Sequence, residues 1–324
     1  MMRLTRRSLL SAIPALGIAG PALAQQPIAP TGTRIVPQQP ERDMDYTLDA
    51  WVDAFGRPTA KVMINGAGPF QFMVDTGSTT TVIAARHQAA MGAEVVGEVL
   101  VAGTTGTAVM PVARLDSVQT GVVSKTGLRV AVLSDDGLAQ ADGILGADVF
   151  AGRRLTFNIK EKVVRIEPSL RQSRIAPVGN MRVRNGLLAE IEGKVGTVTA
   201  KLMLDTGAQN CIANMALGDA LKKAHPRLTR VPNVRVFGVT GHKLVGEFIA
   251  LPKVNLKAFS VVDAGCVAAP APIFDLWDLN KEPAMIVGVN LLSRLDSFSI
   301  DYGAKVFDAK ALSELIARNP SAFG

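Results

Sequence analysis

Two aspartates of this chain stand in nearly the same local sequence. Asp75 lies in Phe-Met-Val-Asp-Thr-Gly-Ser, and Asp205, in the second half of the chain, lies in Leu-Met-Leu-Asp-Thr-Gly-Ala. Each follows a short apolar run that is typical of a buried strand, which places each carboxyl group at a strand end. Two carboxyl groups held about 3 Å apart cannot both be ionised, and such a pair shares one proton. The pair can then supply a general base that activates water and a general acid.

A second motif recurs behind each Asp-Thr-Gly motif. Ile144-Leu145-Gly146 is an apolar-apolar-Gly run that follows the first Asp. Ile286-Val287-Gly288 is its counterpart and follows the second Asp at a similar separation. Each copy then closes with two short alternating runs that are typical of paired strands. Because the whole set of motifs repeats, the sequence predicts two similar domains, at residues 46–167 and 181–324.

With these motifs the sequence resembles the aspartic proteases, specifically the retropepsin-like group. In that group the catalytic Asp precedes Thr-Gly-Ala or Thr-Gly-Ser, and the partner run continues as Gly-x-Asp or Gly-x-Asn, like Gly146-Ala147-Asp148 and Gly288-Val289-Asn290 here. The resemblance covers nearly all of the chain after residue 24 and is closest to a bacterial exported form with two fused halves. It implies an all-β fold of two tandem retropepsin-like β-barrel domains related by a pseudo-twofold, with few short helices.

The resemblance also implies an activity. We expect an aspartic endopeptidase that hydrolyses a peptide or protein substrate through an Asp75/Asp205 dyad, without a cofactor or a metal. His87, His225 and His242 have no partner at the spacing of a metal site or a catalytic triad. Because each half supplies one Asp, we expect a monomer with an internal pseudo-dimer.

The residues beside each Asp are interpreted as supports of the active-site loops. Thr76 and Thr206 are expected to hold the two loops together by hydrogen bonds across the twofold. Gly77 and Gly207 are expected to let the backbone approach the carboxylate of their own half. The apolar-apolar-Gly strands are expected to pass beneath the loops and keep them rigid.

The two motifs differ at one position. Ser78 follows the first Asp-Thr-Gly where Ala208 follows the second, so only Asp75 gains a hydroxyl neighbour. We therefore expect Asp75 to be the more readily ionised member of the pair. Asp148 and Asn290 stand two positions after the later glycines and are expected to cap a short helix behind the site.

Two Gly-containing segments between the paired motifs are candidates for flaps that close over a substrate. The retropepsin-like pattern places one such hairpin in each half, and the alternative for each segment is an ordinary exposed turn. The candidates are Gly103, Thr104, Thr105 and Gly106 in the first half, and Gly238, Val239, Thr240 and Gly241 in the second.

The rest of the chain is expected to be nearly all β, with short alternating runs separated by Gly-containing turns. Helices are expected over residues 84–91, 215–225 and 311–318, and as a single turn after each later glycine. The second half also carries an extra loop, 268–283, which either borders the cleft or only packs against the barrel.

Residues 1–24 have the pattern of an export signal. A basic start ending in Arg6-Arg7, an apolar stretch and the run Ala22-Leu23-Ala24 resemble a twin-arginine signal, with a Sec signal as the alternative. The apolar stretch is shorter than the ~20 residues that a membrane span needs, so stable membrane insertion is not expected. Residues 25–45 are interpreted as a disordered lead-in and 168–180 as a linker. The protein is expected to be periplasmic or secreted.

Composition narrows the classes of function. The chain is 48% hydrophobic and 19% charged, which is a globular balance. The net charge of +7 falls to +4 without Arg3, Arg6 and Arg7, and the other basic residues form no block, so nucleic acid is not an expected partner. Cys211 and Cys266 are too few for a disulfide-dense scaffold or a Cys-rich zinc module. They form a single disulfide or stay as free, buried thiols.

Two alternatives to a monomeric enzyme stay open in the sequence. The same fold can serve as a catalytically inactive module that binds a peptide or a partner, although such a module has no chemical need for two intact Asp-Thr-Gly motifs. Each half can also pair with another chain, although the covalent duplication makes a second chain unnecessary.

Overall fold

A computed structural model describes residues 46–49, 51–53, 56–121, 123–138, 140–169, 179–185, 187–256 and 259–311. The predicted signal peptide 1–24 and the lead-in 25–45 lie outside these ranges, as do most of the predicted linker 168–180 and nearly all of the helix predicted over 311–318. Among the described residues, no helix has both the length and the apolar character to cross a membrane.

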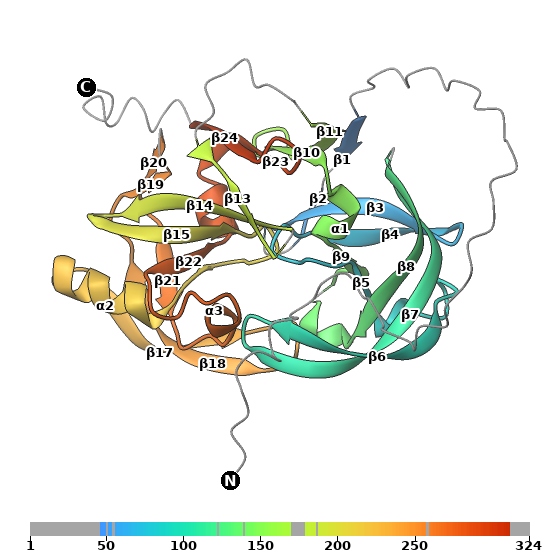
Figure 1. The fold of residues 1–324 in the computed structure, drawn as a ribbon, viewed down its shortest axis with the longest axis horizontal. Coiled ribbons are helices and arrows are strands. Elements are labelled where there is room, and N and C mark those ends of the chain that lie inside the picture. The colour runs from blue at the N-terminus through green and yellow to red at the C-terminus, as the bar shows by residue number, and fades with distance from the viewer. Residues whose placement is uncertain are drawn as a thin grey trace, which may run out of the picture.

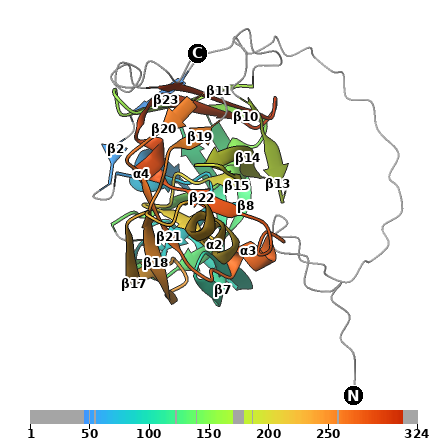
Figure 2. The ribbon, with the colours of Figure 1, turned by 90° about the vertical axis from the view of Figure 1, so that its left-hand side faces the viewer.

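Three β-sheets make up the described molecule (Figure 1). A sheet formed by residues 51–145 lies at the right of Figure 1, and a sheet formed by residues 182–287 lies at the left. A third sheet lies along the top and takes strands from both halves of the chain, and Figure 2 shows it again above the other elements. The prediction of an all-β fold with few short helices is confirmed.

The eight-stranded sheet has the strand order β2-β3-β4-β9-β5-β8-β7-β6. Its strands are β2 (Trp51–Val52), β3 (Pro58–Ile64), β4 (Ala67–Val74), β5 (Val82–Ala84), β6 (Glu94–Gly103), β7 (Gly106–Thr120), β8 (Val123–Leu133) and β9 (Gly143–Leu145).

The ten-stranded sheet has the order β17-β18-β21-β16-β22-β15-β14-β19-β20, and β13 also pairs with β14. Its strands are β13 (Arg182–Arg184), β14 (Leu188–Val195), β15 (Val198–Leu204), β16 (Cys211–Ala213), β17 (Arg230–Phe237), β18 (Lys243–Ala250), β19 (Val254–Leu256), β20 (Phe259–Val261), β21 (Gly265–Ala268) and β22 (Ala284–Val287).

The six-stranded sheet joins the two halves. Its strands are β1 (Tyr46–Asp49), β11 (Val163–Pro168), β10 (Arg153–Asn158), β23 (Leu295–Asp301), β24 (Val306–Ala311) and β12 (Gly179–Asn180), in that order. The strand pair that closes the first half, β10 and β11, therefore lies beside the pair that closes the second, β23 and β24. Phe157 of β10 stacks on Phe298 of β23 with ring centroids 4.6 Å apart, and both belong to one hydrophobic core that spans the halves.

The strands next to each Asp follow the same plan in both halves. Strand β4 runs parallel to β9 with Met73 opposite Ile144, and β15 runs parallel to β22 with Met203 opposite Ile286. β9 and β22 are buried throughout, and β4 and β15 are buried over the three residues before each Asp, which explains why the sequence reads there as continuous apolar runs rather than as strict alternation.

Four short α-helices occur among the described residues: α1 (Ala147–Phe150), α2 (Met215–Ala224), α3 (Ile273–Leu276) and α4 (Val289–Leu292). The helix predicted over 215–225 is confirmed as α2, where the side chain of Asn214 accepts a hydrogen bond from the Leu217 N–H. The single turns predicted after the later glycines are confirmed as α1 and α4.

The helix predicted over residues 84–91 is wrong. Ala84 ends β5, and only a 3₁₀ turn, η1 (Ala85–His87), follows. The backbone N–H groups of this segment bond elsewhere, since that of Ala84 donates to the Asp142 carbonyl and that of Arg86 to the Asp135 carboxylate. The α-helical ladder therefore never starts.

Two long hairpins lie opposite the six-stranded sheet (Figure 1). Strands β6 and β7 form one and turn at Thr104 and Thr105, while β17 and β18 form the other and turn at residues 238–242. The flap candidates of the sequence therefore fall at the tips of two hairpins. Between these tips and the six-stranded sheet lie the ends of β4 and β15, which carry the two Asp-Thr-Gly motifs.

Candidate active site

Each Asp begins a loop that is fixed to the neighbouring parallel strand. The backbone N–H of Asp75 donates to the Leu145 carbonyl at 3.0 Å, and that of Asp205 donates to the Val287 carbonyl at 3.1 Å. The apolar-apolar-Gly runs therefore extend β4 and β15 up to the first residue of each loop. Both loops enter the space between the halves from strands that cannot shift without breaking a buried sheet.

The two threonines bind the loops to one another. The Thr76 hydroxyl donates to the Leu204 carbonyl at 2.9 Å, and the Thr206 hydroxyl donates to the Val74 carbonyl at 2.6 Å. Each hydroxyl also accepts the backbone N–H of the other threonine at 3.1 Å. Both threonines are almost fully buried. Four reciprocal hydrogen bonds therefore cross between the halves directly beneath the carboxyl groups.

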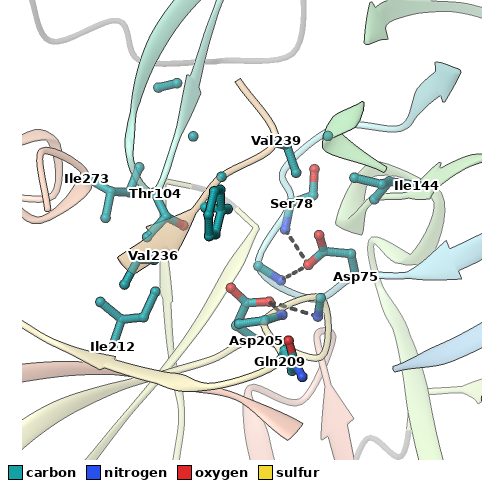
Figure 3. A pocket seen from close by; sticks show the side chains of 18 of the residues that line it. Asp75, Ser78, Thr104, Ile144, Asp205, Gln209, Ile212, Val236, Val239 and Ile273 are labelled. Atoms are coloured by element: carbon teal, nitrogen blue, oxygen red, sulfur yellow. Dashed lines mark hydrogen bonds between the residues drawn. The ribbon is translucent and has the colours of Figure 1, made fainter. Parts of the chain in front are cut away.

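The two carboxyl groups face each other across this junction (Figure 3). Oδ1 of Asp75 accepts the N–H groups of Gly77 at 2.8 Å and Ser78 at 3.1 Å. Oδ1 of Asp205 accepts the equivalent two N–H groups of its own loop at 2.8 and 2.9 Å. The two carboxyl groups are also close enough for the ionisation of one to act on the pKa of the other.

The role expected for the two motif glycines is wrong in one respect. A Cβ atom at Gly77 would collide with the carboxyl group of Asp205, and one at Gly207 would collide with the carboxyl group of Asp75. Each glycine thus makes room for the carboxylate of the opposite half, whereas its N–H serves the carboxylate of its own half. The collision arises between halves, so no local sequence pattern could show it.

Burial and mutual repulsion set the protonation of the pair. Burial raises the pKa of Asp75, and the N–H groups that its carboxylate accepts oppose this rise. Burial raises the pKa of Asp205 well above its usual range, and the charge of Asp75 adds to the rise. Both shifts favour a dyad that holds one proton in total.

The hydroxyl group of Ser78 does not produce this asymmetry. It donates to the Thr80 carbonyl at 2.7 Å, within its own loop. The backbone N–H of Ser78 does reach Asp75, but the backbone N–H of Ala208 makes the same contact with Asp205. The cause that we expected from the sequence is therefore wrong, because a side chain that bonds within its own loop does not distinguish the two carboxyl groups.

The far end of each loop is held by the residue two positions after the later glycine. Asp148 accepts the N–H and the hydroxyl of Thr81 at 3.0 and 2.9 Å. Asn290 accepts the N–H and the thiol of Cys211 at 3.0 and 3.1 Å in the same arrangement. The capping positions are the two glycines before them, so the prediction that Asn290 caps a helix is wrong. Asp148 is not at the capping position either, but its Oδ1 does accept the Val149 N–H in the first turn of α1 at 2.9 Å.

The later glycines lie directly under the loops. A Cβ atom at Gly146 would collide with the backbone of Thr80, and one at Gly288 would lie 2.7 Å from the backbone of Asn210. Cys211 and Cys266 are free, buried thiols in facing positions of β16 and β21, so the disulfide alternative is excluded. Burial raises the pKa of the Cys211 thiol to about 12, which keeps this thiol neutral as a donor to Asn290.

A cleft of about 410 Å³ opens above the carboxyl groups. Its wall in the first half has an apolar cluster, Met73, Val82, Leu133 and Ile144, beside the charged Arg57 and Asp136. Its wall in the second half has an apolar cluster, Ile212, Ile273, Leu276 and Trp277, beside the charged Arg235. Figure 3 shows Ile144 on one side of the carboxyl pair, and Ile212 with Ile273 on the other.

The extra loop 268–283 borders the cleft, so the alternative that it only packs against the barrel is wrong. Ile273, Leu276 and Trp277 line the cleft, whereas Phe274 is turned into the core and meets Trp277 edge to face with centroids 5.9 Å apart. The loop is therefore a wall of the cleft that is anchored by its own aromatic residue. The corresponding segment of the first half has only the 3₁₀ turn η2 (Asp135–Gly137).

The two hairpin tips meet over the cleft. The Thr105 hydroxyl donates to the His242 carbonyl at 3.0 Å, and the Thr240 hydroxyl donates to the Gly106 carbonyl at 3.3 Å. Gly106 also lies against the His242 ring, where a Cβ atom would approach Cγ to 2.7 Å. We call this contact between residues 103–106 and 238–242 the clasp. The sequence located both tips, but it carried no signal that they touch.

No three His, Cys, Asp or Glu side chains come together as a metal site within the ranges that the structure describes. The absence of a metal and of a cofactor stays a prediction. The chemistry that the site offers is that of two buried carboxyl groups with one proton between them, placed at the floor of an apolar cleft.

Comparison with known proteins finds a family for part of the chain. Residues 60–149 match the family model described as aspartyl protease. This segment contains the first Asp-Thr-Gly motif, the first apolar-apolar-Gly run and the first hairpin. No curated protein matches the chain.

Proposed function

We propose that this protein is an aspartic endopeptidase that hydrolyses peptide bonds with the Asp75/Asp205 dyad. The observation that carries the proposal is the pair of carboxyl groups held face to face above reciprocal threonine hydrogen bonds, each with a pKa raised above its usual range. The match of residues 60–149 to aspartyl proteases supports the class of chemistry.

The geometry suits the attack of water on a peptide carbonyl. A water molecule between the carboxyl groups gives a proton to the ionised member as its oxygen attacks the carbonyl carbon. The protonated member donates its proton to the carbonyl oxygen, which leaves a neutral tetrahedral diol. Collapse of the diol breaks the C–N bond, the leaving nitrogen takes the proton that came from water, and a hydroxyl of the diol returns a proton to the second carboxyl group.

The walls of the cleft favour a substrate with apolar side chains on both sides of the cleaved bond. Each half contributes a cluster of apolar side chains to the cleft, and the charged side chains that also line it, besides the two aspartates, are Arg57, Asp136 and Arg235. Burying an apolar side chain of leucine or phenylalanine size contributes roughly 1.5–3 kcal/mol. Closure of the clasp over such a substrate would exclude bulk water from the carboxyl groups.

The proposal includes a monomeric enzyme. Both carboxyl groups, both threonines and both hairpin tips come from one chain, so the site needs no second copy. Activity per milligram should stay constant over a dilution series of the protein. A loss of specific activity on dilution would instead indicate that the dyad forms between chains.

The proposal also includes export of the protein to the periplasm or beyond. Mass spectrometry of protein recovered from the periplasm should give an N-terminus at or near Gln25, and replacement of both Arg6 and Arg7 by lysine should block a twin-arginine route. Recovery of the full-length chain from the cytoplasm alone would contradict this part of the proposal.

The test of activity is cleavage of a diverse peptide library across pH by the protein and its Asn variants. Asp75→Asn and Asp205→Asn should each lower kcat/KM on the order of 10³-fold or more, since each keeps the shape of the side chain and removes the acid. The double variant should be little worse than either single variant, because residues that act as a unit are strongly non-additive.

Two inhibitors sharpen this test. An uncharged mimic with a hydroxyl group in place of the attacked carbonyl should inhibit, because it resembles the tetrahedral diol. A metal chelator should leave the activity unchanged. If the wild-type protein binds peptides but cleaves none of them, or if either Asn variant keeps near-normal activity, the protein is a binding module or uses another site, and the proposal fails.

A further inference from the structure

The two halves differ at one position that faces the carboxyl pair. Thr59 of β3 lies opposite the residue two before the first Asp, and Glu190 of β14 lies opposite the residue two before the second. Arg57 and Leu188 each precede these residues by two, so they occupy equivalent positions. Both line the cleft. The first half thus presents a permanent positive charge where the second presents an apolar side chain.

Arg57 is held in place by an acidic neighbour. Its backbone N–H donates to Oδ1 of Asp53 at 2.9 Å, its Nε donates to Oδ2 at 2.6 Å, and a terminal guanidinium nitrogen lies 2.6 Å from the same oxygen. Only 9% of Arg57 is exposed, and only 3% of Leu188. The guanidinium is therefore a fixed charge at the cleft rather than a mobile surface group.

We propose that Arg57 is a positioning residue that keeps the negative charge of the carboxyl pair on Asp75, so that Asp75 is the general base and Asp205 holds the proton. This inference rests on the proposed function. The matching position in the other half, Leu188, offers Asp205 no such charge, and the backbone hydrogen bonds of the two carboxyl groups are otherwise the same.

The other titratable groups around the pair do not supply this asymmetry. Asp136 and Arg235 also line the cleft, but neither is among the groups that shift the pKa of either aspartate. Tyr302 is buried in the core that spans the halves, and its pKa is raised first by burial and then by the charges of both aspartates, so its phenol stays neutral. The thiol of Cys211 is neutral as well. Of the described groups whose charge acts on the pair, Arg57 is the one that brings a positive charge, and its effect lowers the pKa of Asp75.

The assignment gives each proton transfer a direction. Water loses a proton to Asp75 as the new C–O bond forms, and Asp205 gives its proton to the carbonyl oxygen. When the C–N bond breaks, the proton on Asp75 moves to the leaving nitrogen and a diol hydroxyl restores the proton of Asp205. The pair returns to its starting state with no other reactant.

Two variants that break the same ion pair should shift the pH profile of kcat/KM in opposite directions. Arg57→Leu removes a positive charge from beside the monoanionic pair and should move the midpoint of the acidic limb to a pH about one unit higher. Asp53→Asn leaves the guanidinium without its counter-charge and should lower that limb. Arg57→Lys keeps a positive charge and should restore most of the wild-type profile.

A matched control comes from the second half. The Nε atom of Arg184 donates to Glu190 at 2.5 Å in a comparably buried ion pair that shifts neither aspartate. Arg184→Leu should lower stability without moving the acidic limb. If Arg57→Leu and Asp53→Asn shift the limb in the same direction, or not at all, Arg57 has only a structural role and the inference is wrong.

A second readout does not depend on peptide cleavage. In protein labelled with ¹³C at the aspartate carboxyl carbons, difference spectra against Asp75→Asn and Asp205→Asn identify the two resonances of the pair. In the wild-type protein the Asp75 resonance should titrate first as pH rises, and Arg57→Leu should move this step upward. If no variant cleaves peptides but this titration is found, the proposed function fails and the electrostatic inference stands; if Asp205 titrates first, the inference fails whatever the activity.

Discussion

Removal of the Thr76 hydroxyl tests whether the threonine junction holds the halves together. In Thr76→Val the Leu204 carbonyl loses its donor and the Thr206 N–H loses its acceptor, while the shape of the side chain is kept. Thr76 has no exposed surface, so water cannot replace these partners. An unsatisfied buried polar group costs about 1–3 kcal/mol. Two such groups should lower the free energy of unfolding by about 2–6 kcal/mol.

Two control variants separate the hydroxyl from the methyl group and from the β-propensity of valine. Thr76→Ser keeps both hydrogen bonds and loses one methyl group, which should cost only about 1 kcal/mol. Thr126→Val changes an exposed threonine on β8 and should leave stability nearly unchanged. Urea unfolding followed by circular dichroism would give all three free energies.

The same variants test the link to activity. A displacement of about 1 Å at a reacting group can lower the rate about 10²-fold, so Thr76→Val should lose far more activity than Thr76→Ser. If Thr76→Val unfolds with a free energy within about 1 kcal/mol of that of Thr76→Ser, the hydrogen bonds at the junction contribute little. The rigidity that we attribute to the site would then have to come from the sheets alone.

Three further outcomes are expected. The pKa of Asp205 is raised in the folded state, so its protonated form stabilises the fold at pH values below the unfolded pKa. This contribution is lost as pH rises through the folded pKa. Asp205→Asn should therefore raise the Tm at pH 7 but not at pH 3. Thr105→Val combined with Thr240→Val should speed amide hydrogen exchange at the hairpin tips more than elsewhere in the chain, because both hydroxyl hydrogen bonds of the clasp are lost. A thiol reagent should label no cysteine in the native protein and two after denaturation, whereas a disulfide would give none in either state.

The local sequence alone predicted the fold class and the residues at the strand ends. Apolar runs before Asp75 and Asp205 identify buried strands, and each Asp-Thr-Gly motif marks the loop that follows its strand. Such signals depend only on neighbours in the chain, so they can be read from residue type and spacing. Repetition of the whole set of motifs then predicted two similar halves and brought one Asp from each into the same hypothesis.

Contacts between the halves could not be predicted in this way. Gly77 lies against the carboxyl group of Asp205, and the hydroxyl of Thr105 bonds to a hairpin that is remote in the sequence. The sequence also failed to predict the partners of three side chains. The Ser78 hydroxyl bonds to the Thr80 carbonyl, Asp148 to Thr81 and Asn290 to Cys211. Only the folded chain selects among such partners, because the choice depends on which backbone groups the sheets leave unpaired.

The asymmetry of the carboxyl pair shows the same division. The sequence identified two nearly equal acids, and its one visible difference beside them, Ser78, proved to bond elsewhere. The difference that faces the pair is Arg57, which lies outside the motif of Asp75 and is aligned with Leu188 only through the strand registers. A sequence motif specifies which groups can ionise. The charge that each group carries depends on burial and on the charges that the tertiary structure brings near it. Electrostatic energy depends on distance in space and on the local dielectric, not on separation along the chain.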